Sequence, residues 1–352
     1  MTTSPDFGPA ALPRSLDAAL RDVTSRKLQV RRSATRELGA HVASAARARV
    51  VQVLEELAEQ DGDIEVRAQA VLAMADGGAH EAIGKLVHLA KVAAPRVRQM
   101  ALLALGELAE PDSLEAIDAA LAATGSELPA LRYQGLVTLR HLQGLGAVAV
   151  LASRLTDSDD EVRWVAIRLL DELSVENTNQ PDVSRSIDET IRQVSPALRS
   201  ASQDPNLRVA TAAGLLLARW GDPKAIGGLT AMLSDKNSEM DEQDELAAIR
   251  LTARWRVTEA KATLQKRAWP RFLEGPTTFA ARLALAQLGD ERARQSILDD
   301  LDSASPAKCA RAIEPVGSLG LVAGRARLKV LLENPQGQDA EAIRLALQML
   351  GE

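Results

Sequence analysis

The sequence predicts an all-α protein, specifically an α-α superhelix (α-solenoid) of about ten helix pairs. Three observations support this prediction. A unit of two amphipathic helices, clearest at residues 204–235, recurs along the chain. The copies are spaced by roughly 31 to 36 residues, the range of two-helix repeats. Only 2% of the residues are aromatic, which suits tightly packed helices rich in alanine and leucine.

In the clearest copy, apolar residues from Val209 to Trp220 recur with the 3.6-residue period of a helix. Gly221-Asp222-Pro223 then ends this helix, and a second apolar stripe begins at Ala225. Neither helix can bury its stripe alone, so the pairs must stack on one another. We call the Val209 position the anchor and the helix that carries it the anchor helix. Anchors are predicted at Val30, Val66, Val97, Leu131, Val162, Val209, Asp244, Thr277 and Lys308, with a tenth copy around Ile343.

The same pattern gives the domain prediction. Residues 1–13 are expected to be a disordered lead, and residues 14–352 a single continuous solenoid. The step from Val162 to Val209 is longer than the others, and the polar residues 174–188 lack an apolar period, so a loop insertion is predicted there. Pro315 lies inside the ninth anchor helix and is expected to kink or shorten it.

The repeat also has a recognisable consensus. It appears as Asp63 with Val66-Arg67, as Asp159 with Val162-Arg163, and as Leu288-Gly289-Asp290. This pattern resembles HEAT repeats, and is most similar to the short bacterial form named after phycobilisome lyases. The resemblance extends from about Ser15 to Glu352 and implies the solenoid fold. It does not select a function, because such proteins include scaffolds, chromophore lyases, DNA-repair glycosylases and iron hydroxylases.

Several function classes lack support in the residues. Cys309 is the single cysteine, which excludes a disulfide framework within one chain. The pair His80-Glu81 occurs once, whereas the resemblance to iron hydroxylases would require repeated His-Glu pairs. No metal-binding, nucleophile-elbow or phosphate-loop motif is present. We therefore predict no catalytic residues, no metal and no cofactor. Without an apolar leader or membrane-spanning run, a cytoplasmic location is expected.

An arginine follows the anchor in five copies, and two interpretations are open. The arginines could form a basic ladder for phosphates. The favoured interpretation is structural, with each arginine paired to an acidic turn residue such as Asp63 or Asp159. The series comprises Arg31, Arg67, Arg98, Arg132 and Arg163.

Aromatic residues divide into two groups by their place in the repeat. Trp220 and Trp255 stand where other copies carry leucine, so both are predicted to lie in the core. Tyr133, Trp164 and Phe279 come two residues after the anchor, outside the main apolar stripe. Tyr133 and Trp164 belong to consecutive copies and should be neighbours, either at a binding surface or in gaps between repeats. The residues predicted to bind a partner are Tyr133, Arg140, His141, Trp164, Arg168, Asp171, Arg219 and Arg254.

The leading functional hypothesis is a non-enzymatic scaffold or adaptor that holds a protein partner along the concave face, which anchor helices line in HEAT solenoids. The alternatives are a nucleic-acid-binding, glycosylase-like protein and a chromophore-lyase subunit. The first alternative would use Tyr133 and Trp164 for stacking and Asp171 for chemistry. The net charge of −6 makes nucleic acid an unlikely partner. The pattern does not predict the identity of the partner or the oligomeric state.

Overall fold

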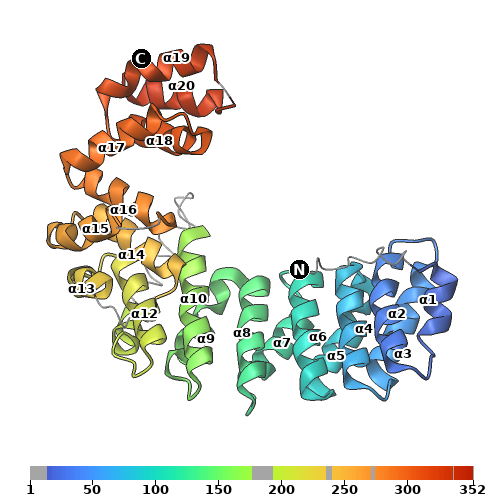
Figure 1. The fold of residues 1–352 in the computed structure, drawn as a ribbon. Helices are drawn as coiled ribbons and strands as arrows, with labels where there is room; N and C mark the ends of the chain where they lie inside the picture. The colour runs from blue at the N-terminus through green and yellow to red at the C-terminus, as the bar shows by residue number, and fades with distance from the viewer. Residues whose placement is uncertain (1–13, 177–192, 235–239, 271–273, 336, 352) are drawn as a thin grey trace, which may run out of the picture. The chain divides into compact units, whose positions relative to one another are not determined.

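The computed structural model describes residues 14–176, 193–234, 240–270, 274–335 and 337–351. Within these ranges every regular element is a helix, and the helices follow one another as antiparallel pairs (Figure 1). Each of the nine predicted anchors lies in the first turn of a helix, and Ile343 of the tenth copy lies in another helix. The predicted all-α repeat fold is therefore confirmed. The predicted lead at residues 1–13 lies outside the described residues.

The chain forms two compact units, Met1–Thr190 and Ile191–Glu352. In the first unit the anchor helices are α2 (Leu28–His41), α4 (Ile64–Asp76), α6 (Pro95–Leu108), α8 (Pro129–Gln143) and α10 (Asp160–Glu176). Their partner helices are α1 (Leu16–Asp22), α3 (Arg47–Gln60), α5 (Ile83–Val92), α7 (Leu114–Thr124) and α9 (Val148–Ser153).

The second unit repeats this plan. Its anchor helices are α12 (Leu207–Arg219), α14 (Glu242–Arg254), α16 (Pro276–Gln287), α18 (Pro306–Ser318) and α20 (Ala340–Met349). The helical residues 193–201 precede α12, and the other partner helices are α13 (Pro223–Ser234), α15 (Lys261–Ala268), α17 (Glu291–Leu301) and α19 (Arg325–Glu333). Whether the two units continue one another as a single solenoid remains a prediction.

Local sequence signals set where the helices begin and end. Asp63 and Asn206 accept hydrogen bonds from the first-turn backbone N–H groups of α4 and α12, as N-cap residues do. Proline stands in the first turn of α6, α8, α16 and α18, where its missing N–H costs no helical hydrogen bond. These signals recur at the repeat spacing, so the turn chemistry and the apolar period agree.

Adjacent anchor helices pack side by side within each unit except at α16 and α18, and two of these contacts lie at small residues. Gly39 of α2 lies against Ala73 of α4, where a side-chain Cβ on Gly39 would come within 3.1 Å of the Ala73 carbonyl oxygen. Gly317 of α18 lies against Ala346 of α20 even more closely, with 2.7 Å from such a Cβ to the Ala346 Cα. Close approach buries the apolar stripes of both helices and leaves no room for larger side chains at these points.

Three sequence predictions need correction. Helix α10 continues to Glu176, so the predicted loop at 174–188 starts too early, and its remainder lies outside the described residues. Helix α18 runs through Pro315 to Ser318, so this proline does not shorten it. Trp255 is 37% exposed and is no core residue, because its indole N–H reaches back to donate a hydrogen bond to the Ala218 carbonyl at 2.8 Å.

Among the described residues, Pro129–Thr156 is the one stretch apolar and long enough to cross a membrane, with a mean hydropathy of 1.3. It is not one continuous helix, since 3-10 turns at Gly144–Ala147 and Arg154–Thr156 interrupt it. Helix α8, which begins this stretch, packs against α6, α7 and α10, and 44% of the apolar window within Pro129–Thr156 is buried.

The end of α14 generates a stability prediction. Arg256 adopts a left-handed backbone conformation with φ of 51°, at the point where α12 and α16 are followed by Gly221 and Gly289. A residue with a Cβ loses roughly 1–2 kcal/mol in this conformation. Arg256→Gly is therefore expected to stabilise the second unit by about 0.5–1 kcal/mol, measured by urea unfolding. Arg256→Ala keeps the unfavourable backbone and should change stability little. If both variants unfold at the same urea concentration, backbone strain at this position is not the cause.

Candidate functional site

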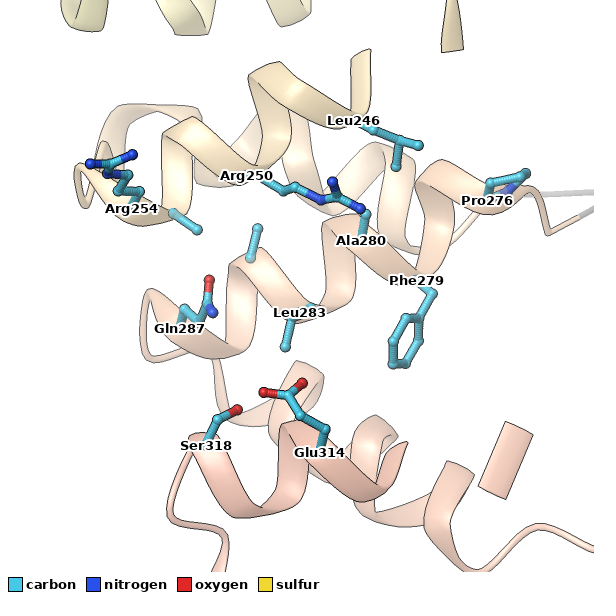
Figure 2. A pocket seen from close by; sticks show the side chains of 12 residues that line it. Leu246, Arg250, Arg254, Pro276, Phe279, Ala280, Leu283, Gln287, Glu314 and Ser318 are labelled. Carbon is cyan, nitrogen blue, oxygen red and sulfur yellow. The ribbon is translucent and has the colours of Figure 1, made fainter. Parts of the chain in front are cut away.

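The second unit contains an open cavity of about 590 Å³ on its anchor-helix layer (Figure 2). Helix α16 contributes the middle of its lining, and α14 and α18 contribute the two sides. The apolar lining comes mainly from Leu246, Phe279 and Leu283, which are partly buried. The volume lies within the usual range for binding pockets, roughly 300–1,000 Å³.

The cavity exists because α16 and α18 do not pack against each other as other adjacent anchor helices within a unit do; both helices are described in full. Where α18 meets α20, Gly317 faces Ala346. In the same repeat register, Ala286 of α16 would face Pro315 of α18. The proline ring is bulkier than an alanine methyl group, and proline removes one helical hydrogen bond. Pro315 thus occupies the contact position at the one junction in the second unit where adjacent anchor helices have few contacts.

The other end of the α16–α18 junction is closed by Phe279 and Arg311. The Arg311 guanidinium lies over the Phe279 ring, 4.5 Å from its centroid, and forms an ion pair with Asp300 at 2.6 Å. Glu274 lies 3.8 Å from Arg311 and 2.5 Å from Arg282. The hydrogen bond from Arg282 is the main reason that the pKa of Glu274 is lowered. Arg311 thus covers part of the Phe279 ring, and Phe279 also lines the cavity.

Charged and polar side chains surround the apolar lining. Arg250 and Arg254 are exposed on successive turns of α14, and Glu314 is exposed on α18. Figure 2 shows Leu283 and Phe279 on the side of α16 that faces α18, with Glu314 across from Leu283. A cavity with an apolar floor and a few fixed charges has the general make-up of a binding site.

The first unit brings together six of the eight predicted site residues. Tyr133, Arg140 and His141 lie on α8, and Trp164, Arg168 and Asp171 lie on α10, which packs beside α8. Trp164 and Tyr133 are half-buried, and the Arg168 guanidinium lies 5.8 Å from the Trp164 ring centroid. Arg140 Nε lies 3.5 Å from Glu172 Oε2, which joins the two helices. We call these six residues the α8–α10 cluster.

Arg219 and Arg254 belong to the second unit, at the ends of α12 and α14, which pack together. Arg219 is partly buried, whereas Arg254 is exposed and lines the cavity. The Arg254 guanidinium also lies 5.3 Å from the Trp255 ring centroid. Of the predicted residues, Arg254 alone belongs to the cavity lining.

Sequence reasoning missed most of this lining, including Leu246, Arg250, Leu283 and Glu314. Each of them lies at an ordinary surface position of its helix in the repeat template. The available signal was Pro315, which was interpreted as a helix breaker and not as a spacer between two helices. Phe279 was singled out by its position but was not assigned to the binding site.

The arginine series is structural, as the favoured interpretation held. Arg31 and Arg132 pair with acidic turn residues as predicted, Asp61 and Asp157, whereas the other three donate to backbone carbonyls. Arg67 and Arg98 donate hydrogen bonds to the carbonyls of Ala58 and Ala90, near the ends of the preceding helices, at 3.2 and 3.0 Å. Arg163 donates to the Asp157 carbonyl at 2.9 Å. Such bonds satisfy helix-end carbonyls that lack intrahelical partners. Asp63 instead pairs with Arg32 at 3.0 Å.

Among the described residues, no three His, Cys, Asp or Glu side chains are grouped to hold a metal ion. Cys309 is 3% exposed, and burial raises the pKa of its thiol, which lowers its reactivity. His80 bonds the Leu108 carbonyl through Nδ1 at 2.9 Å. The polar and charged residues of the cavity lining are Arg250, Arg254, Gln287, Glu314 and Ser318.

The ion pair between Arg132 and Asp157 gives a pH-dependent prediction. It spans 2.5 Å, and the two side chains are 9% and 4% exposed. Burial acts to raise the pKa of Asp157, but the Arg132 hydrogen bond and the Asp159 N–H outweigh it, so the pKa is lowered. The carboxylate therefore stabilises the fold above its unfolded-state pKa of about 4, and this contribution is lost as pH falls through the folded-state value.

Asp157→Asn is expected to lower the unfolding free energy at pH 7 by roughly 3 kcal/mol, because it leaves Arg132 without its charged partner. The difference in unfolding free energy between the variant and the wild type should become smaller as pH decreases below about 4. Urea unfolding at several pH values measures both effects. Asp160→Asn, an exposed neighbour, serves as the control. A gap that is constant with pH would contradict the assigned ion-pair contribution.

Comparison with known proteins agrees with this architecture. The family model for HEAT repeats matches residues 51–127 and 89–171. No curated protein is similar enough in sequence to count as a relative. The X-ray structure of the Escherichia coli protein YibA has 13% sequence identity and a TM-score of 0.55, covering 78% of this chain and 93% of its own. This match supports the fold alone.

The complex of CpcE and CpcF of phycocyanin lyase from Nostoc sp. PCC7120 also matches, with 16% identity and a TM-score of 0.41, covering 82% of this chain and 100% of that chain. At that TM-score the similarity indicates neither a shared function nor a detailed fold. The helix pairs of both units repeat the plan of the segment that the family model matches. Residues 51–171 of the chain match HEAT repeats.

Proposed function

We propose that this protein is a non-enzymatic scaffold that binds a partner protein through its layer of anchor helices. The cavity between α14, α16 and α18 carries the proposal. It interrupts an otherwise closely packed layer and places partly buried apolar side chains beside exposed charges. A cytoplasmic location for this scaffold is likewise our expectation.

The α8–α10 cluster is proposed as a second contact surface, in the first unit. Trp164 is half-buried and has Arg168 over its ring, a combination frequent among the residues that dominate binding energy at interfaces. Tyr133 occupies the equivalent position on the adjacent helix. Arg140, His141 and Asp171 lie further along the same two helices. Arg219 and Arg254 extend the proposed contacts in the second unit.

A nucleic-acid-binding function would require the same cluster to hold phosphates. Arg140 is instead paired with Glu172, and the chain carries a net charge of −6, which disfavours a polyanion. We expect no binding of duplex DNA at micromolar protein and low salt, measured by fluorescence anisotropy. Saturable binding under these conditions would favour the nucleic-acid alternative.

The test of the proposed function starts from capture of partner proteins by the immobilised full chain, with identification by mass spectrometry. A purified candidate is then titrated by calorimetry against the wild type and Leu283→Glu. A carboxylate in the cavity should weaken binding at least ten-fold, because a charge then replaces apolar contact. Val330→Glu introduces the same charge on α19, in the other layer, and serves as the control. Equal affinity for Leu283→Glu and the wild type would contradict binding at the cavity.

The α8–α10 cluster gives a separate prediction. Trp164→Ala should weaken partner binding by about 2 kcal/mol or more while leaving the thermal unfolding midpoint nearly unchanged. Were Trp164 only a packing residue, the truncation would cost roughly 3–5 kcal/mol of stability and leave affinity intact. Trp269→Ala, which removes a half-buried indole outside the anchor-helix layer, is the matched control. Loss of stability with unchanged affinity would overturn the role of the cluster.

A further inference from the structure

The charges at the edge of the cavity specify what kind of segment it can hold. Arg250 and Arg254 are four residues apart on α14, so they lie one helical turn apart along the same side of the cavity. Both are exposed, and Glu314 is the acidic side chain of the lining, on the α18 side. The two sides of the cavity therefore differ in charge.

Neighbouring charges do not cancel the two arginines. Within the part of the chain that the structure describes, no carboxylate forms an ion pair with Arg250 or Arg254. Glu314 of the lining forms no ion pair with either arginine in the described part of the chain, and two other acidic residues near the α16–α18 junction pair elsewhere, Glu274 with Arg282 and Asp300 with Arg311. Arg250 and Arg254 can therefore form ion pairs with carboxylates of a bound molecule.

We propose that the cavity binds an acidic, amphipathic peptide segment of a partner protein. Apolar side chains of the segment would contact Leu283 and Phe279, and two carboxylates would pair with Arg250 and Arg254. The arginines are about 6 Å apart along α14, which matches carboxylates four residues apart on a helix or two apart on a strand. Glu314 repels carboxylates on the α18 side, so the segment binds in one orientation. The proposal rests on the proposed partner-binding function and adds the chemistry of the partner.

Apolar contact and charge have different parts in this recognition. Exposed ion pairs contribute little each, so the affinity comes mainly from the apolar side chains in the cavity. The arginines act on specificity and on the rate of association, because they attract acidic segments and repel basic ones. Binding should consequently weaken as salt concentration rises, since exposed charges are screened.

A random peptide library displayed on phage and selected on the immobilised full chain tests the inference. The selected peptides are synthesised, and their dissociation constants are measured by fluorescence anisotropy. We expect enrichment of Asp and Glu next to Leu, Phe or Trp. The double variant Arg250→Glu/Arg254→Glu should weaken these peptides at least ten-fold, and so should Leu283→Glu. Lys224→Glu/Lys266→Glu changes the net charge equally on α13 and α15, outside the cavity lining, and should stay within two-fold of the wild type.

Three outcomes would overturn the inference: selected peptides without an excess of acidic residues, peptides whose binding does not depend on Leu283, and equal weakening by both double variants. Circular dichroism of each variant confirms that it is folded.

The results separate the two proposals. If a natural partner depends on Leu283 but the peptides are not acidic, partner binding stands and the acidic chemistry is wrong. If acidic peptides bind at the cavity but the chain captures no protein, the acidic chemistry of the cavity stands and the scaffold function is wrong.

Discussion

The whole structure depends on burying apolar stripes that no single helix pair can bury. Each anchor helix must approach the next closely enough to exclude water from both stripes, and small residues make that approach possible. Gly39 against Ala73 and Gly317 against Ala346 show the constraint directly: a methyl group added to Gly317 would collide with α20, and one added to Gly39 would press tightly on α4. Stability in such an array accumulates from contacts between neighbouring repeats. A local defect in packing therefore changes one junction and leaves the others intact.

Arginines and turn residues support this layer from its ends. Helix ends expose carbonyl groups that lack partners, and the arginine after the anchor supplies donors to the end of the preceding helix. Arg132 does more, since it bridges the Ser126 and Glu127 carbonyls and the buried Asp157. These contacts recur with the repeat because the geometry of each junction is nearly the same. The arginine series that resembled a phosphate ladder is better explained as a set of links between repeats.

The fold could be predicted from the sequence because its determinants are local and repeated. Apolar period, N-cap residues and glycine-proline turns stand at fixed distances from each anchor, and every copy reinforces the others. Two predictions failed: α10 continues to Glu176, past the predicted start of the loop, and Trp255 bonds the Ala218 carbonyl of α12 while 37% of it stays exposed. Helix propensity and apolar period describe local sequence and give no information on contacts between helices.

The cavity was harder to predict because it arises from a missing contact. Its lining residues are ordinary in the template, and they lie at the junction where Pro315 takes the place at which α20 carries Ala346. A repeat pattern identifies the residues that recur in every copy, whereas this cavity lies where one copy departs from the repeat. A substitution at the contact between anchor helices can therefore mark a candidate binding site, as a loop insertion can, even where the helix stays intact. In this chain the intact helix α18, with a proline at its contact position, marks the junction that contains the cavity.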